Sequence, residues 1–166
     1  MNSELEKAMD LPPDFSSSFT DRMAILADHI ARSLSIPVSH ETEMNYSSAQ
    51  KLKVWADVQG TPVLPLDRKA RYVVVVFVSS RAPYCAIVCL EIIGLQSGRL
   101  ELKALPLENV PPGLRACADQ IAAKLADAGY HFISGDISKE IAKGHVTEMD
   151  GAPATVFDVL FSEIIG

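Results

Sequence analysis

The sequence of 166 residues lacks the short motifs that mark common catalytic and nucleotide-binding loops. Its nine glycines are scattered, and neither G-x-x-x-x-G-K nor G-x-G-x-x-G occurs, which excludes the usual phosphate-binding loops. There is also no G-x-S-x-G nucleophile elbow and no H-E-x-x-H zinc helix. The four histidines do not pair with other ligand side chains at metal-binding spacing. We therefore predict no catalytic residue, no metal site and no cofactor.

Long apolar runs and a secretory leader are missing as well. The longest apolar stretch is Tyr72–Val78, far shorter than the roughly 20 residues that span a bilayer. The first ten residues carry Glu4, Glu6 and Asp10 and have neither the basic nor the apolar region of a signal peptide. An odd number of cysteines, three, suits a reducing compartment. We therefore expect a cytoplasmic protein that does not bind membranes.

The three cysteines do not suggest a disulfide or a metal site. Cys85 and Cys89 are four residues apart in a predicted strand, which separates them by roughly 13 Å. A disulfide needs Cα atoms within about 7 Å. Cys117 belongs to the apolar stripe of a predicted helix. We expect all three to be small buried hydrophobic residues.

Basic residues are fewer than acidic ones: there are 15 lysines and arginines and 21 aspartates and glutamates, so the net charge is −6. A general nucleic-acid binder needs a basic face, so we expect no nucleic-acid partner. The charge is uneven: residues 1–50 and 111–166 carry −5 and −4, whereas residues 51–110 carry +3. Two explanations fit this pattern. The charges lie on solvated helix faces and strand ends, or they form one acidic face that binds a basic partner.

What the sequence contains is a clear alternation of strand and helix patterns. It predicts an α+β fold, with a mostly meander antiparallel sheet of about five to seven strands and two main helices packed on it. Residues 1–17 form a flexible acidic N-terminal arm with a short helical turn at Ser3–Met9, and residues 18–166 form one domain. The predicted helices are 19–34, 111–128 and 136–143, a loop covers 38–50, and the predicted strands are 51–58, 71–78, 84–93, 100–105, 130–134, 145–149 and 154–165.

Two valine- and isoleucine-rich segments support this fold most strongly. Arg71–Val78 and Tyr84–Ile93 are apolar on both alternating faces, as expected for interior strands. The turn Asp150-Gly151-Ala152-Pro153 predicts a final hairpin that closes onto the meander and protects an edge.

Acidic side chains are the candidate partner-binding residues. Each also fits a structural role as a helix cap, a helix surface, a strand edge or a turn. The candidates are Glu41, Glu43, Asp136, Glu140, Glu148 and Asp150.

In size, acidity and α+β build, the chain resembles small bacterial immunity proteins, which neutralise a partner toxin. No motif carries this resemblance residue by residue, so it assigns no site. We interpret the chain as a non-catalytic protein that binds another protein with a basic surface. The alternatives are a small-molecule-binding sensory domain with an enclosed apolar pocket, and an enzyme in which two of His145, Glu148 and Asp158 meet in a cleft. A homodimer in which the strand Leu100–Leu105 of one copy pairs with the same strand of a second copy is compatible with each of these three functions.

Overall fold

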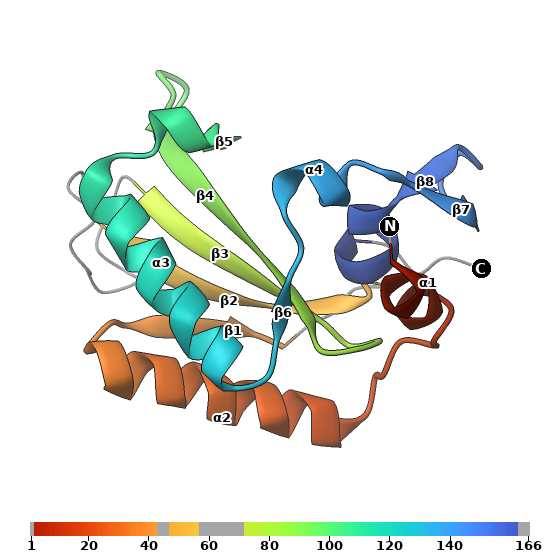
Figure 1. Cartoon of the computed structure of the whole chain (residues 1–166). Coiled ribbons are helices and arrows are strands. Elements are labelled where there is room, and N and C mark those ends of the chain that lie inside the picture. Colours follow the sequence, from red (N-terminus) through yellow and green to blue (C-terminus); the bar gives the residue numbers. More distant parts are fainter. Residues whose placement is uncertain (1, 43–46, 57–71, 163–166) are drawn as a thin grey trace.

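The computed structural model describes residues 2–42, 47–56 and 72–162 (Figure 1). It confirms the α+β class, with a six-stranded, mostly antiparallel sheet and helices packed on it. In chain order the elements are α1 (Ser3–Met9), α2 (Ser17–Leu34), β1 (Val38–Glu41), β2 (Ala49–Ala56), β3 (Tyr72–Ser79), β4 (Tyr84–Gly94), β5 (Leu100–Ala104), the short 3-10 helix η1 (Leu107–Asn109), α3 (Pro112–Asp127), β6 (His131–Phe132), α4 (Gly135–Ser138), β7 (Ile141–Val146), β8 (Pro153–Thr155) and the π-helical turn η2 (Asp158–Ser162).

The sheet is the predicted meander, in the order β1-β2-β3-β4-β5. Its centre is β3, whose valines are buried on both faces. A strand that is apolar on both faces is stable only where both faces are covered or where its neighbours are apolar. Strands β2 and β4 are these neighbours of β3. Strand β4 is long enough to pair with β5 through one half and in parallel with β6 near its start. Both predicted segments are strands of this sheet: β3 is buried on both faces, whereas most residues of β4 are half-buried. Arg71 lies outside the described residues.

Two amphipathic helices cover one face of the sheet. In α2 the buried residues Phe19, Met23, Leu26 and Ile30 recur at helical spacing, as the sequence predicts. Ser16 caps this helix by accepting a hydrogen bond from the N–H of Phe19 at 3.3 Å. The buried face of α3 joins the same core. This larger core holds both helices against alternate side chains of β2, β3 and β4.

A second, smaller core lies against the other face, at one end of the sheet (Figure 1). The helix α1 packs there against the C-terminal segments, so the two ends of the described chain lie side by side. An aromatic pair joins the C-terminal segment to the sheet, with the rings of Phe77 on β3 and Phe157 5.2 Å apart, edge to face. The buried members are Leu5, Met9, Ala49, Ala86, Ile133, Ala142, Ala154, Val156, Val159, Leu160 and Phe161.

The sequence interpretation was wrong for residues 38–50. We expected a loop there, but β1 forms at Val38–Glu41 and β2 begins at Ala49. Strand β1 is short and polar at the sheet edge, so it has no apolar alternation to reveal it.

Two C-terminal predictions were also wrong. The helix expected at 136–143 ends at Ser138, and the following residues form β7. The strand expected at 154–165 is extended only to Thr155 and then turns helical; residues 163–165 lie outside the described residues. The buried residues Val156, Val159 and Leu160 have a helical spacing, although alternating aromatics had suggested a strand.

The final hairpin does not extend the meander. Strands β7 and β8 form a separate two-stranded sheet. The register between them slips within β7, where Gly144 has a positive φ of 84°. Such an irregular strand is poorly suited to join a regular sheet edge.

Candidate functional site

Acidic side chains outnumber basic ones on the segments that form the second core. We define the acidic lobe as residues 2–10 and 134–162, which include α1, α4, β7, β8 and η2. These segments contain eight carboxylates and three lysines, a formal charge of −5 out of −6 for the whole chain. The first and last described segments of the chain thus form one acidic region. A concentrated charge of this kind attracts cationic groups over a distance of about 8 Å in physiological salt.

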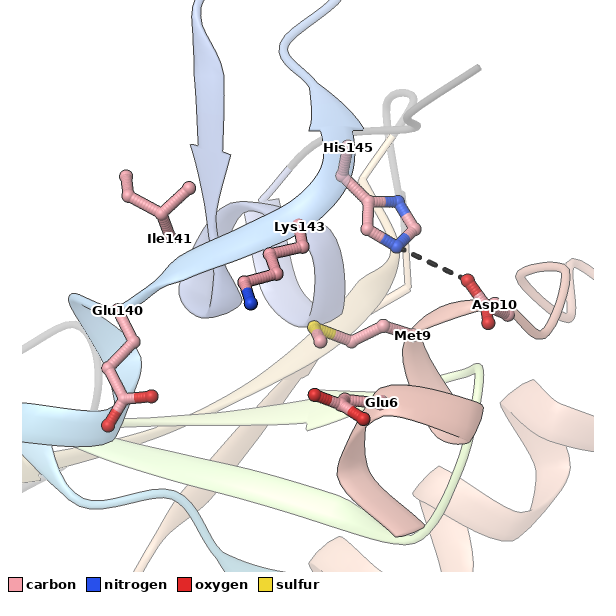
Figure 2. Close-up of a pocket in the computed structure, with 7 residues that line it drawn as sticks. All are labelled: Glu6, Met9, Asp10, Glu140, Ile141, Lys143 and His145. Atoms are coloured by element: carbon pink, nitrogen blue, oxygen red, sulfur yellow. Dashed lines mark ion pairs between the residues drawn. The ribbon is translucent and has the colours of Figure 1, made fainter. Parts of the chain in front are cut away.

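A cleft of about 560 Å³ opens in the acidic lobe between α1 and β7. Figure 2 shows Glu6 and Met9 of α1 across from Lys143 and His145 of β7. Successive side chains of a strand point to opposite sides, which directs alternate residues of β7 into the cleft while Ala142 is buried in the core. The described residues that line it are Glu6, Met9, Asp10, Glu140, Ile141, Lys143 and His145.

The cleft combines three carboxylates with a small apolar surface. Glu6, Asp10 and Glu140 are exposed, and they outnumber the single lysine. Ile141 is 53% exposed, and Met9 contributes to the lining although it is largely buried. Carboxylates beside apolar side chains suit a lysine or arginine, whose aliphatic stem packs on apolar atoms while its charged end meets the oxygens.

One ion pair crosses the cleft. The Nε2 atom of His145 lies 3.4 Å from Oδ1 of Asp10, and the histidine side chain is 16% exposed whereas the aspartate is 76% exposed. These residues are 135 positions apart in the sequence. The contact joins Asp10, the residue that follows α1, to β7.

The cleft has few of the groups that a covalent reaction needs. Its lining residues contain no serine, threonine or cysteine that could act as a nucleophile beside the histidine. No group of three or more His, Cys, Asp or Glu side chains in the described part of the chain is arranged to hold a metal ion. The described lining thus offers three carboxylates, one lysine and one histidine as its ionisable groups.

The structure distributes the predicted binding residues over several places. Glu140 lines the cleft, and Asp136 is exposed on the first turn of α4. Glu148 and Asp150 are exposed in the turn between β7 and β8. Glu41 lies on β1 and pairs with Lys53, with Nζ and Oε2 3.3 Å apart. Glu43 lies outside the described residues.

Two carboxyl groups of the acidic lobe, those of Asp150 and Asp158, have a structural role that the geometry shows directly. The hydroxyl of Thr147 and the N–H of Ala152 donate hydrogen bonds to Asp150, and they lower the pKa of its carboxyl. Asp150 therefore organises the hairpin turn. Asp158 accepts from the N–H and the hydroxyl of Thr155 at 2.9 and 2.8 Å, which places it in a helix cap.

The sequence interpretation missed Glu6 and Asp10 as cleft residues. We had treated residues 1–17 as an arm, although Leu5 and Met9 already show the i, i+4 spacing of a buried helix face. Glu6 and Asp10 have the same spacing one position later and thus lie together on the adjacent, exposed side of the helix.

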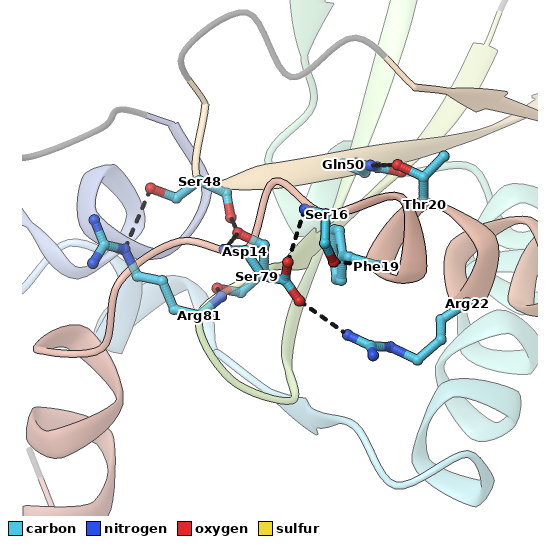
Figure 3. A network of polar contacts seen from close by, with 10 residues as sticks. Asp14, Ser16, Phe19, Thr20, Arg22, Ser48, Gln50, Ser79 and Arg81 are labelled. Carbon is cyan, nitrogen blue, oxygen red and sulfur yellow. Dashed lines mark hydrogen bonds and ion pairs between the residues drawn. The ribbon is translucent and has the colours of Figure 1, made fainter.

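A second hollow, of about 470 Å³, lies near the turn between β3 and β4. Figure 3 shows the network of polar contacts beside it, in which Asp14 pairs with Arg22 and Arg81 bonds to Ser48. Asp14 accepts from the N–H of Ser16 and pairs with Arg22 at 3.4 Å, and these contacts lower the pKa of its carboxyl. The hydroxyl of Ser80 accepts from the N–H of Asp14 at 3.1 Å. This network fastens the segment between α1 and α2 to the sheet.

The cysteines are free and buried, as predicted. Burial raises the pKa of Cys85 to about 12 and, with smaller effects from Cys117 and Asp119, that of Cys89 to about 11. Burial also raises the pKa of Cys117. All three therefore remain protonated at neutral pH, in which state a thiol is a poor nucleophile.

Among the described residues, no helix is both long enough and apolar enough to cross a bilayer. Comparison with known proteins adds no relative: no family model, no curated protein and no solved structure matches this chain.

Proposed function

We propose that this chain is a non-catalytic protein-binding protein whose acidic lobe receives a basic surface of another protein. The observation that carries the proposal is the cleft between α1 and β7, in which three carboxylates surround apolar side chains. A lysine or arginine of the partner enters this cleft, with its stem against Met9 and Ile141 and its charged end between Glu6 and Glu140.

The surface around the cleft supports a protein partner rather than a small cation. Ile141, Val146 and Met149 are large apolar residues with exposed fractions of 53%, 48% and 89%. They lie on β7 and in the turn that follows it, within the acidic lobe. Apolar contact area with charged neighbours is typical of a protein interface, where the apolar part supplies affinity and the charges supply rate and specificity.

The kind of partner that fits best is a basic protein that this chain neutralises by occupying its charged surface. An inhibitor of the immunity type works in this way, because a compact acidic domain can block a basic active site without any chemistry of its own. The acidic charge also accelerates association with such a partner.

A specific observation favours a second candidate function. The pair of His145 and Asp10 brings two titratable side chains from distant segments together in a cleft, as an acid–base enzyme would need. The described lining offers no serine, threonine or cysteine, so such an enzyme would use an activated water molecule or a lining carboxylate as its nucleophile. The sensory alternative has no comparable support, since both hollows described above have charged linings.

The proposal can be tested with a charge reversal in the cleft and a matched control. The tagged full chain and its Glu6→Lys/Glu140→Lys variant are used to capture partners from the source cell, and the affinity of the recovered partner is then measured with purified proteins. We expect the variant to bind at least about tenfold more weakly. We also expect wild-type affinity to fall as salt rises from about 50 to 300 mM, because salt screens the charges.

The control is Asp119→Lys/Asp127→Lys, which makes the same charge change at two exposed positions of α3. Equal loss of affinity in both variants would indicate a general charge effect and would contradict a role for the cleft. A His145→Asn variant separates the second candidate, because it removes acid–base function while leaving the three carboxylates in place. Retained binding to the partner would support our proposal.

A further inference from the structure

The main sheet has an open edge at β5. This strand comes last in the sheet order and, among the described strands, pairs only with β4. All five of its residues are exposed, and Figure 1 shows the strand at one margin of the sheet. An open edge presents unpaired backbone N–H and C=O groups to which another strand can bond.

The hairpin of β4 and β5 shows which residues present these groups outward. Leu95 N donates to Arg99 O at 2.8 Å, and Leu105 N donates to Cys89 O at 2.9 Å. Backbone groups of successive residues alternate in direction along an antiparallel ladder, so the odd-numbered residues of β5 bond to β4. The N–H and C=O groups of Leu100, Leu102 and Ala104 therefore point away from the sheet.

Apolar side chains accompany this open edge. Leu100 and Leu102 on β5 are 73% and 53% exposed, and the flanking Leu95 and Leu107 are 42% and 63% exposed. Four of the eleven large exposed apolar residues in the described chain thus gather at this end of the sheet. A protein that stays monomeric protects such an edge with proline, a bulge or charged side chains. Strand β5 has no proline and no bulge, and its only charged residues are Glu101 and Lys103.

The two charged residues of β5 indicate what occupies the edge. Glu101 and Lys103 flank Leu102 symmetrically. If β5 of a second copy pairs antiparallel about a two-fold axis at Leu102, Glu101 of each copy lies opposite Lys103 of the other. Leu100 lies opposite Ala104, and the two Leu102 residues meet at the axis. The strand is therefore complementary to itself in both charge and apolar contact.

We propose that β5 is a homodimer interface, in which the β5 strands of two copies pair antiparallel about Leu102 and join their sheets. The outward backbone groups of Leu100, Leu102 and Ala104 form the hydrogen bonds between the strands. Glu101 and Lys103 then occupy the pairs without backbone bonds, in which facing Cα atoms are only about 4.5 Å apart and side chains interact most closely. The interface is independent of the proposed function, because no residue of the cleft lies on β5.

Charge variants test this register directly by light scattering after size-exclusion chromatography and by analytical ultracentrifugation of the full chain. Glu101→Lys alone places lysine opposite lysine, and Lys103→Glu alone places glutamate opposite glutamate. We expect each variant to raise the dimer dissociation constant about tenfold or more. Mixing the two variants restores opposite charges at both positions, so the mixture forms a heterodimer with wild-type affinity.

Recovery on mixing also shows that both variants fold, so weaker dimerisation cannot be attributed to unfolding. Arg115→Glu, at an exposed position of α3, is the control for the charge change and leaves dimerisation unaltered. A wild-type chain that stays monomeric up to about 0.5 mM overturns the proposal, since a specific interface of useful strength would be populated there. A dimer that neither variant weakens also overturns it.

Discussion

Arg81 shows how a single residue joins distant parts of this chain. It is 9% exposed and has no carboxylate partner among the described residues. Its Nη1 donates to the carbonyls of Met9, at 3.3 Å, and of Leu11, while Nε donates to the hydroxyl of Ser48 at 3.4 Å. Met9 is the last residue of α1, where free carbonyls concentrate partial negative charge. The burial that lowers the pKa of Arg81 is thus offset by oriented backbone dipoles.

Replacing Arg81 with leucine should lower the free energy of unfolding by about 1–3 kcal/mol, because buried carbonyls lose their donor. Lysine should restore only part of this stability, since its single ammonium cannot reach three acceptors as the guanidinium fork does. Urea denaturation monitored by circular dichroism measures both variants. Arg115→Leu is the matched control on an exposed arginine, and equal stability of the two leucine variants would show that Arg81 does not fasten α1.

Cys85 gives the protein a pH dependence in the alkaline range. In the unfolded chain a thiol ionises near pH ~8.5, whereas in the folded chain burial raises the pKa of Cys85 to about 12. Below about pH 8.5 both states hold the proton. Between that pH and about 12 only the unfolded state loses it, so stability falls as pH rises, by up to about 1.4 kcal/mol per pH unit. Cys85→Ala should flatten the slope of unfolding free energy between pH 9.5 and 11.5, and parallel slopes would contradict this account.

At the scale of elements, the C-terminal helical segment depends on a reciprocal cap. The N–H of Asp158 donates to the hydroxyl of Thr155 at 3.2 Å, and the N–H of Thr155 donates to the carboxylate of Asp158 at 2.9 Å. This is the arrangement of a capping box, in which each side chain satisfies a backbone donor of the other residue. The Thr-x-x-Asp spacing was visible in the sequence, but the alternating aromatics had indicated a strand.

Thr155→Ala should therefore lower the free energy of unfolding by about 1 kcal/mol, a usual value for losing an N-cap. Thr155→Ser, which keeps the hydroxyl, should retain most of the stability. Thermal and urea unfolding of the three chains measures the difference. If alanine and serine give the same stability, the hydroxyl does not cap this segment.

The elements that the sequence predicted well are those with a long, unambiguous period. The valine run of β3 and the four-turn stripe of α2 leave a single physical solution, because every other conformation exposes many apolar side chains. Short elements lack this redundancy. In β1 and β7 neighbouring strands decide the conformation, and those contacts cannot be read from a four- or six-residue pattern.

The candidate site could be predicted only in part for the same reason. Glu140 and His145 were recognised as side chains able to bind or react, and both line the cleft. Glu6 and Asp10 reach it only because α1 packs on the C-terminal segments, a contact between residues more than 130 positions apart. No local pattern specifies such a contact. The burial of Leu5 and Met9 provides the missing information.

At the scale of the whole molecule, the acidic lobe exists only if the N-terminal helix stays attached. Leu5 and Met9 are 4% and 2% exposed within the second core. Leu5→Ala should thus destabilise the protein by about 2–5 kcal/mol, as truncation of a buried leucine usually does. Lys7→Ala, at an exposed position of the same helix, should change stability by less than about 0.5 kcal/mol. Both values come from urea denaturation. If residues 1–17 instead form the flexible arm that the sequence suggested, Leu5→Ala will be as neutral as Lys7→Ala, and the cleft will lose one of its two walls.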